Sequence, residues 1–111
     1  MNHEKLECYR QLVAAAEEVA RSVSRWPRGH ADLADQLRRA MTSAVLNLCE
    51  GNGKRRYRRE RRRFFEISLG SISEVSAALE LARVFSLIEA SELESIKSRL
   101  KLAYVQTRAL P

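Results

Sequence analysis

The stretch ADLADQLRRAMTSAVLNLCEG, residues 31–51, decides the fold class of this chain. Its apolar side chains return every three or four residues, which places them on one face of a helix. Asp32 is a suitable N-cap, and Gly51 is a suitable residue to follow the last helical turn. The predicted inward stripe is Leu33, Leu37, Met41, Ala44 and Leu48.

The same periodicity predicts three more helices on either side of this one. The first runs from about Glu4 to Ser24 and ends before the break at Trp26-Pro27-Arg28-Gly29. Its predicted inward residues are Leu6, Tyr9, Val13, Ala16, Ala20 and Val23.

The third and longest predicted helix runs from about Tyr57 to Ile88, and the fourth begins near Ser91, which we expect to be its cap. The stripe expected for the third helix is Phe64, Ile67, Ser71, Val75, Leu79 or Ala78, Ala82 and Phe85. The stripe expected for the fourth is Leu93, Ile96, Leu100, Ala103 and Thr107.

No segment alternates polar and apolar residues at the period of a strand, so the fold class is predicted to be all-α. The 111 residues suffice for one domain, spanning 1–111. Because the expected loops are short, successive helices should pack as antiparallel neighbours. We therefore expect an up-down-up-down four-helix bundle.

The positive charge of the chain is concentrated in one short window. Residues 54–63 hold eight bases and one acid, a local charge of +7, whereas the other 12 bases and 13 acids nearly balance. Within a helix, the pairs Arg58/Arg62 and Arg59/Arg63 repel, each at about 0.2–0.5 kcal/mol. Cations at a helix N-terminus also oppose the helix dipole.

A cluster that weakens its own helix is better explained by an anionic partner than by solubility. Arginine, which supplies seven of the eight bases, binds phosphate through a planar fork. We therefore predict nucleic-acid binding, to RNA rather than DNA; an acidic protein partner remains the alternative. The predicted contact residues are Lys54, Arg55, Arg56, Tyr57, Arg58, Arg59, Arg61, Arg62 and Arg63. The long third helix should carry this cluster to one end of the bundle.

The remaining features indicate neither catalysis nor a cofactor. Gly51-Asn52-Gly53-Lys54 lacks the spacing and the Ser or Thr of a phosphate-binding loop. His3 and His30 have no acids or cysteines at metal-ligand spacing. The two cysteines, Cys8 and Cys49, are expected to be buried free thiols. Without a signal peptide or membrane span, we expect a cytoplasmic protein with no metal, small-molecule substrate or membrane partner.

Three blocks of the sequence resemble one known family. They are Gln36-Leu37-Arg38-Arg39-Ala40, then Asn47-Leu48-Cys49-Glu50-Gly51, then the segment from Glu60 through Phe64-Phe65-Glu66-Ile67-Ser68-Leu69-Gly70-Ser71 to Glu74. Together they are similar to the pattern of the 23S rRNA intervening-sequence proteins. Leu48, Cys49, Phe65 and Ser68 replace the family's usual residues with others that a helical core accepts.

The resemblance implies an antiparallel four-helix bundle that assembles as a ring-shaped homopentamer and has no enzymatic activity. A distant branch of the same family comprises the accessory proteins of diversity-generating retroelements, which are thought to bind nucleic acid through a basic surface. In a pentamer, five copies of the +7 cluster would supply multivalent contact with one RNA. Asn47, Glu50, Gly51 and Gly70 are expected to serve the fold, the last through a close helix contact.

Overall fold

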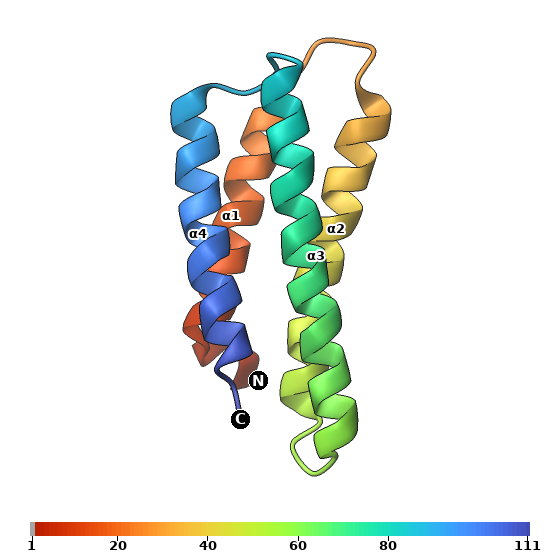
Figure 1. Cartoon of the computed structure of the whole chain (residues 1–111), viewed down its shortest axis with the longest axis vertical. Coiled ribbons are helices and arrows are strands. Elements are labelled where there is room, and N and C mark those ends of the chain that lie inside the picture. The colour runs from red at the N-terminus through yellow and green to blue at the C-terminus, as the bar shows by residue number, and fades with distance from the viewer. Residues whose placement is uncertain (1) are drawn as a thin grey trace.

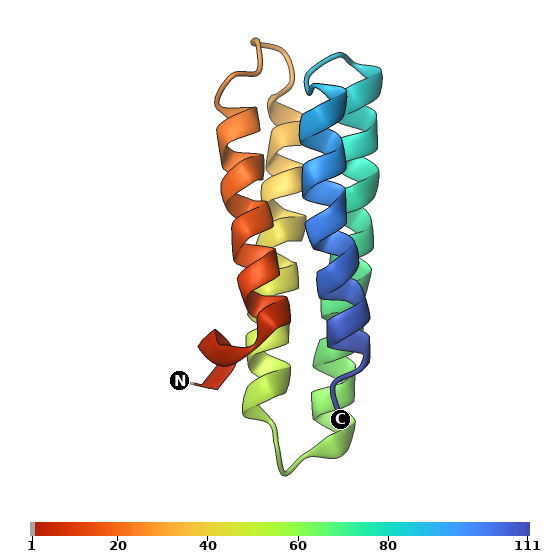
Figure 2. The same cartoon turned by 90° about the vertical axis from the view of Figure 1, so that its left-hand side faces the viewer.

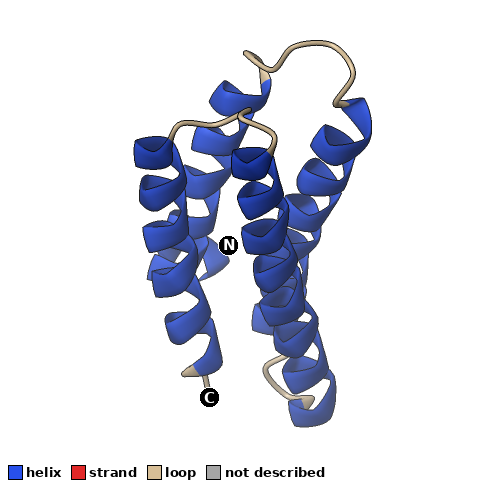
Figure 3. Ribbon diagram, turned by 45° about the horizontal axis from the view of Figure 1, so that its top comes forward, coloured by secondary structure: helices blue, strands red, loops and turns tan. Residues whose placement is uncertain are grey.

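The computed structural model describes residues 2–111 and contains a short 3-10 turn followed by four long helices. The turn, η1, spans Asn2–Lys5. The helices are α1 (Glu7–Val23), α2 (Ala31–Gly53), α3 (Arg58–Val84) and α4 (Ala90–Arg108). Short loops join them, and no strand occurs in the described residues (Figure 3). The all-α prediction is confirmed.

The four helices form an elongated bundle whose extents are 46 × 23 × 21 Å. Successive helices run in opposite directions along its long axis, as the colour order shows (Figure 1). α2 packs most extensively against α3, and α1 packs mainly against α4. The turned view shows α2 and α3 continuing past the ends of α1 and α4 at the end where both termini lie (Figure 2).

A continuous apolar core runs between the helices. It includes the fully buried residues Leu12, Leu37, Leu48, Leu79 and Ile96. The inward stripes predicted for residues 31–51 and for the fourth helix are largely buried, so those predictions are confirmed. Only their first members, Leu33 and Leu93, stay partly exposed.

A polar seam joins α2 to α3 beside the apolar core. The buried Ser68 hydroxyl donates to the Ala44 carbonyl at 2.7 Å, and the hydroxyls of Ser43 and Ser71 lie 2.7 Å apart. Asn47 donates its amide hydrogen to the Ser43 carbonyl at 2.9 Å. Small hydroxyl side chains therefore allow these two helices to approach closely while their buried polar groups remain paired.

The stripe predicted for the first helix is displaced around the helix axis. α1 buries Cys8, Leu12, Ala15, Val19, Ser22 and Val23, so only Val23 was placed correctly among its fully buried residues. The predicted residues instead form an adjacent face that is partly exposed, as at Val13 and Ala16. Because α1 is apolar on two adjoining faces, periodicity alone does not identify the one that meets the core.

The N-terminal part of the stripe predicted for the third helix is also wrong. Phe65, not Phe64, is buried at 1% exposure, and Ile67 remains 40% exposed. Farther along α3 the predicted Ser71, Val75, Ala78, Leu79 and Ala82 are buried. Gly70 is exposed, and a Cβ added there would meet nothing within 4 Å, so the expected close contact at Gly70 is absent within the protomer.

The helix boundaries differ from the predicted ones by a few residues. α2 continues to Gly53 instead of stopping at Gly51, and His30 rather than Asp32 precedes its first turn. α3 ends at Val84, where the amide of Leu87 donates to the Ala82 carbonyl at 2.8 Å and that of Ser86 to the Arg83 carbonyl at 3.0 Å. This pair of bonds is a Schellman motif, and it places Ser86 at a φ of 59°.

α4 begins with a capping box rather than with a Ser91 cap. Glu89 is the N-cap. Its side chain accepts a hydrogen bond from the backbone amide of Glu92, and the side chain of Glu92 accepts one from the backbone amide of Glu89. Acidic groups at this position also favour the helix dipole. The Glu92 carboxylate pairs in addition with Arg25 from the end of α1.

Both cysteines are free thiols, Cys8 buried and Cys49 only half-buried. Burial raises the pKa of the Cys8 thiol above its ordinary value, despite an opposing interaction with Thr107. Burial and then the charge of Glu50 raise the pKa of Cys49. Among residues 2–111, the helices lack the long apolar stretch that a bilayer span requires.

Candidate nucleic-acid interface

The projecting end of the α2–α3 pair carries residues 54–63, which we call the basic hairpin. It consists of the loop at 54–57 and the first turns of α3. Figures 1 and 2 show this connection at the lower tip of the molecule, beyond the ends of α1 and α4. The sequence predicted a cluster at one end of the bundle, and the structure places it there.

Close packing between Gly51 and Phe65 fixes the geometry of the hairpin. A Cβ added at Gly51 would lie 2.6 Å from two ring carbons of Phe65 and 3.2 Å from the Arg61 carbonyl oxygen. Gly51 therefore serves as a contact surface inside the last turns of α2, not as the residue after the helix. The choice of Phe65 over Phe64 as the core residue follows from this contact.

Arg61 differs from the other arginines of the basic hairpin because it folds back onto the protein. Its guanidinium donates to three backbone oxygens, those of Pro111 at 2.7 Å, Gly51 at 3.0 Å and Asn52 at 3.2 Å. It also lies over the Phe65 ring, 4.8 Å from the centroid. Burial, and secondarily the charge of Arg55, lower the pKa of Arg61. Its function is thus to tie the end of α2 to α3 and to the chain end.

The other predicted contact residues extend into solvent. Tyr57 is 62% exposed, and Lys54 is half-buried. In the described part of the chain none of the remaining bases makes an ion pair, and the exposed Glu60 makes none either. The exposed arginines of this group are Arg55, Arg56, Arg58, Arg59, Arg62 and Arg63.

Elsewhere on the molecule bases and acids nearly balance in number, and some of them form ion pairs. Arg99 binds Glu18 at 2.6 Å between α4 and α1, and Lys97 lies 3.3 Å from Glu80 on α3. The contrast places the unneutralised positive charge of the protomer at one tip. A dense, uncompensated group of guanidinium groups is suited to a polyanion, whose phosphates it can contact bidentately.

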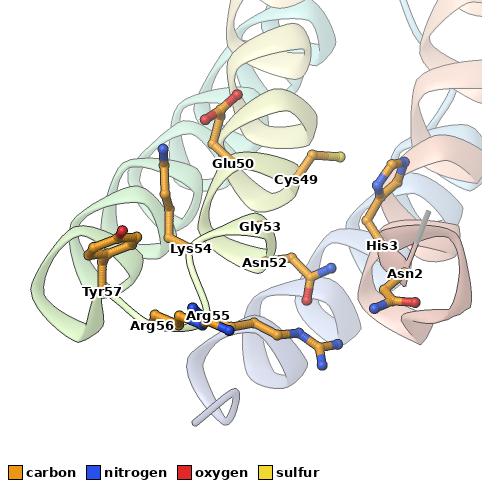
Figure 4. Close-up of a pocket in the computed structure, with 10 residues that line it drawn as sticks. All are labelled: Asn2, His3, Cys49, Glu50, Asn52, Gly53, Lys54, Arg55, Arg56 and Tyr57. Carbon is orange, nitrogen blue, oxygen red and sulfur yellow. The ribbon is translucent and has the colours of Figure 1, made fainter.

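A pocket of about 570 Å³ lies beside the basic hairpin, between η1 and the end of α2 (Figure 4). Its lining combines both sides of the hairpin loop with the N-terminal turn. The lining residues are Asn2, His3, Cys49, Glu50, Asn52, Gly53, Lys54, Arg55, Arg56 and Tyr57.

Asn52 is the residue of this region that sequence reasoning missed. It follows Gly51, the predicted helix end, but it lies in the last turn of α2 and is only 7% exposed. Its backbone oxygen accepts from Arg61, whereas its side-chain amide has no hydrogen-bond partner within residues 2–111. Its burial could have been predicted only by knowing that α2 continues for two residues beyond Gly51.

A search of the curated proteins found no significant match. The family model described as 23S rRNA-intervening sequence protein matches residues 4–104, which covers all four helices almost completely. The chain therefore belongs to the 23S rRNA-intervening sequence protein family.

Proposed function

We propose that this protein is a non-enzymatic, RNA-binding helical bundle that holds RNA phosphates with its basic hairpin. The observation that carries the proposal is the uncompensated charge of the hairpin: its exposed arginines have no acidic partner among residues 2–111. The proposed contacts are Lys54, Arg55, Arg56, Tyr57, Arg58, Arg59, Arg62 and Arg63; Arg61 acts within the fold instead.

RNA rather than an acidic protein is the proposed partner because of the kind of base involved. Guanidinium groups form bidentate bonds with phosphate and stack on bases, and Tyr57 adds an exposed ring to the same loop. The exposed cations also lie at the projecting tip of the bundle, where a nucleic-acid backbone can approach them. We propose that binding takes place in the cytoplasm.

We further propose that the protein acts as a homo-oligomer, the homopentamer that its family resemblance implies. An unpartnered apolar groove of about 420 Å³ between α1 and α2 supports this assembly. Val13, Ala16 and Leu46 line it, and Leu46 is 58% exposed. Apolar surface of this kind marks contacts between proteins, and several basic hairpins on one particle would strengthen binding to one RNA.

The mass of the particle tests the assembly. Native mass spectrometry should report a discrete oligomer for the natural chain and a smaller species for Leu46→Glu, which introduces a charge into the groove. A monomeric natural chain at micromolar concentration would contradict the oligomer but would leave the single-protomer RNA proposal intact.

RNA binding itself is tested with two charge-matched variants. Arg58, Arg59 and Arg62 changed together to Glu remove the cluster, whereas Arg21, Arg28 and Arg39 changed to Glu alter the net charge equally at exposed sites outside it. Nuclease-treated protein is titrated into labelled single- and double-stranded RNA at about 50 and 200 mM salt, between which phosphate-dominated affinity falls by orders of magnitude.

The proposal predicts salt-sensitive binding that the hairpin variant loses and the control variant largely keeps. Equal loss in both folded variants would mean that overall charge, not the hairpin, attracts RNA. An absence of binding by the natural protein at low salt would overturn the proposal and favour an acidic protein partner.

A further inference from the structure

The pocket beside the basic hairpin contains a side-chain amide, that of Asn52, for which the fold supplies no hydrogen-bond partner among the described residues. Asn52 is 7% exposed. The amide atoms are not sealed inside the protein, so they are available to a ligand that enters the pocket. Figure 4 shows the amide projecting from the end of α2 toward the side on which Asn2 and His3 lie.

The pocket around this amide has a net positive lining. Lys54, Arg55 and Arg56 contribute three bases and Glu50 contributes one acid. Figure 4 shows Arg55 and Arg56 below Asn52, where the loop leaves α2. A ligand in this space therefore meets guanidinium groups suited to an anion next to an amide that both donates and accepts.

An aromatic group stands at the opposite wall. The His3 ring lines the pocket and is held edge-on against Tyr9, with 4.9 Å between the ring centroids. Histidine rings are among the surfaces on which unstacked RNA bases lie. With a volume of about 570 Å³, the pocket falls within the size range of sites that enclose a small ligand.

We infer that this pocket holds one unpaired nucleotide of the bound RNA, with the Asn52 amide on the edge of its base and Arg55 and Arg56 on its phosphate. The inference rests on the proposed function and adds a preference to it. An amide pairs with a base edge that carries one donor and one acceptor. In a duplex the Watson–Crick edge is occupied, so a bulge, loop or strand end is selected over continuous helix.

The experiment compares a fully paired RNA duplex with the same duplex carrying one bulged 2-aminopurine. The bulged RNA should bind the natural protein about 5- to 50-fold more tightly, the discrimination expected of one good amide–base pair. Its 2-aminopurine emission should also change on binding. This emission is measured with the natural protein, so it reports on the pocket even if a substitution there unfolds the protein.

Asn52→Leu should reduce the affinity for the bulged RNA to that for the duplex and leave the duplex affinity unchanged. Gln36→Leu is the control, because it removes a side-chain amide at an exposed position of α2 away from the pocket. Circular dichroism confirms that both variants remain helical.

The possible failures are distinguishable. Equal binding of bulged RNA and duplex, with unchanged 2-aminopurine emission, would overturn the inference and leave the hairpin proposal in place. Tighter binding of free 5′-AMP than of bulged RNA would also overturn it, because the ligand would then be a free nucleotide. If neither RNA binds at all, the proposed function fails together with the inference.

Discussion

Within the basic hairpin, a single arginine has a different task from its neighbours. Arg61 donates to the backbone oxygens of Gly51, Asn52 and Pro111, whereas Arg58 and Arg62 extend into solvent. A run of bases in a sequence does not reveal which member turns back toward a helix end. That choice depends on the carbonyl groups that become available when α2 ends beside α3.

Arg61→Met should therefore lower stability more than it lowers RNA affinity. We expect a loss of about 1–3 kcal/mol in the free energy of unfolding, because three bonds from a charged donor disappear while the alkyl stem remains. Urea denaturation at fixed protein concentration measures the change. Arg58→Met is the control and should leave stability nearly unchanged; equal effects of the two substitutions would contradict the assignment.

Two glycines on facing helices have opposite roles, although both were expected to be structural. Gly51→Ala should destabilise the protein by about 1–3 kcal/mol, because its Cβ would lie 2.6 Å from the Phe65 ring and force the hairpin apart. Gly70→Ala should instead stabilise by about 0.5–1 kcal/mol, because the site is helical, exposed and open.

Thermal unfolding of the two variants checks this contrast. A destabilising Gly70→Ala accompanied by loss of the oligomer would mean that another protomer approaches this glycine closely. A neutral Gly51→Ala would contradict the packing between Gly51 and Phe65.

At the scale of elements, the number and type of the helices were predictable from the sequence, whereas several of their faces and ends were not. The stripe of α2 was predicted correctly from its spacing, although Val45 and the exposed Leu46 are apolar residues outside it. α1 carries small apolar residues on two adjoining faces, so either fits the spacing. The adjacent pair Phe64-Phe65 is equally ambiguous until its packing against Gly51 is known.

The end of α3 illustrates a second limit. A Schellman motif normally places glycine at its left-handed position, and here Ser86 occupies it at a φ of 59°. Without a glycine to mark the turn, the apolar residues up to Ile88 prolonged the predicted helix. The stop signal is therefore supplied by backbone hydrogen bonds and not by residue type.

The first turns of α3 bear a charge arrangement that opposes helix stability. Arg59→Glu should increase the free energy of unfolding by about 0.5–1.5 kcal/mol, because it places an acid at the helix N-terminus and replaces the repulsion with Arg63 by attraction. The same change should weaken RNA binding. Denaturation in urea at low and high salt measures the stability gain, which should shrink as salt screens these interactions.

A decrease in stability on Arg59→Glu would contradict this account, because it would show that the arginine is used by the fold. Glu74→Gln, at an exposed position farther along α3, serves as the control for a charge change outside the hairpin. Stability gained together with affinity lost would be the signature of a residue retained for binding.

At the scale of the whole molecule, charge is distributed in two regimes. Over the rest of the bundle bases and acids nearly balance in number, and some pair across helices, as Arg99 does with Glu18 and Lys97 with Glu80. At the projecting tip, a local charge of +7 within residues 54–63 is left unmatched. The position of the tip was predictable from composition and helix length, but the pocket at Asn52 was not, because it needs η1 folded back against α2.

The salt dependence of RNA binding tests the central claim most directly, since its slope counts the phosphates that the protein neutralises. Arg58, Arg59 and Arg62 changed together to Gln should reduce the slope of log affinity against log salt by about 2–3, roughly one for each lost phosphate contact. Arg21, Arg28 and Arg39 changed to Gln should leave the slope unchanged. The same slope for the natural protein and the hairpin variant would contradict the claim that the hairpin contacts RNA phosphates.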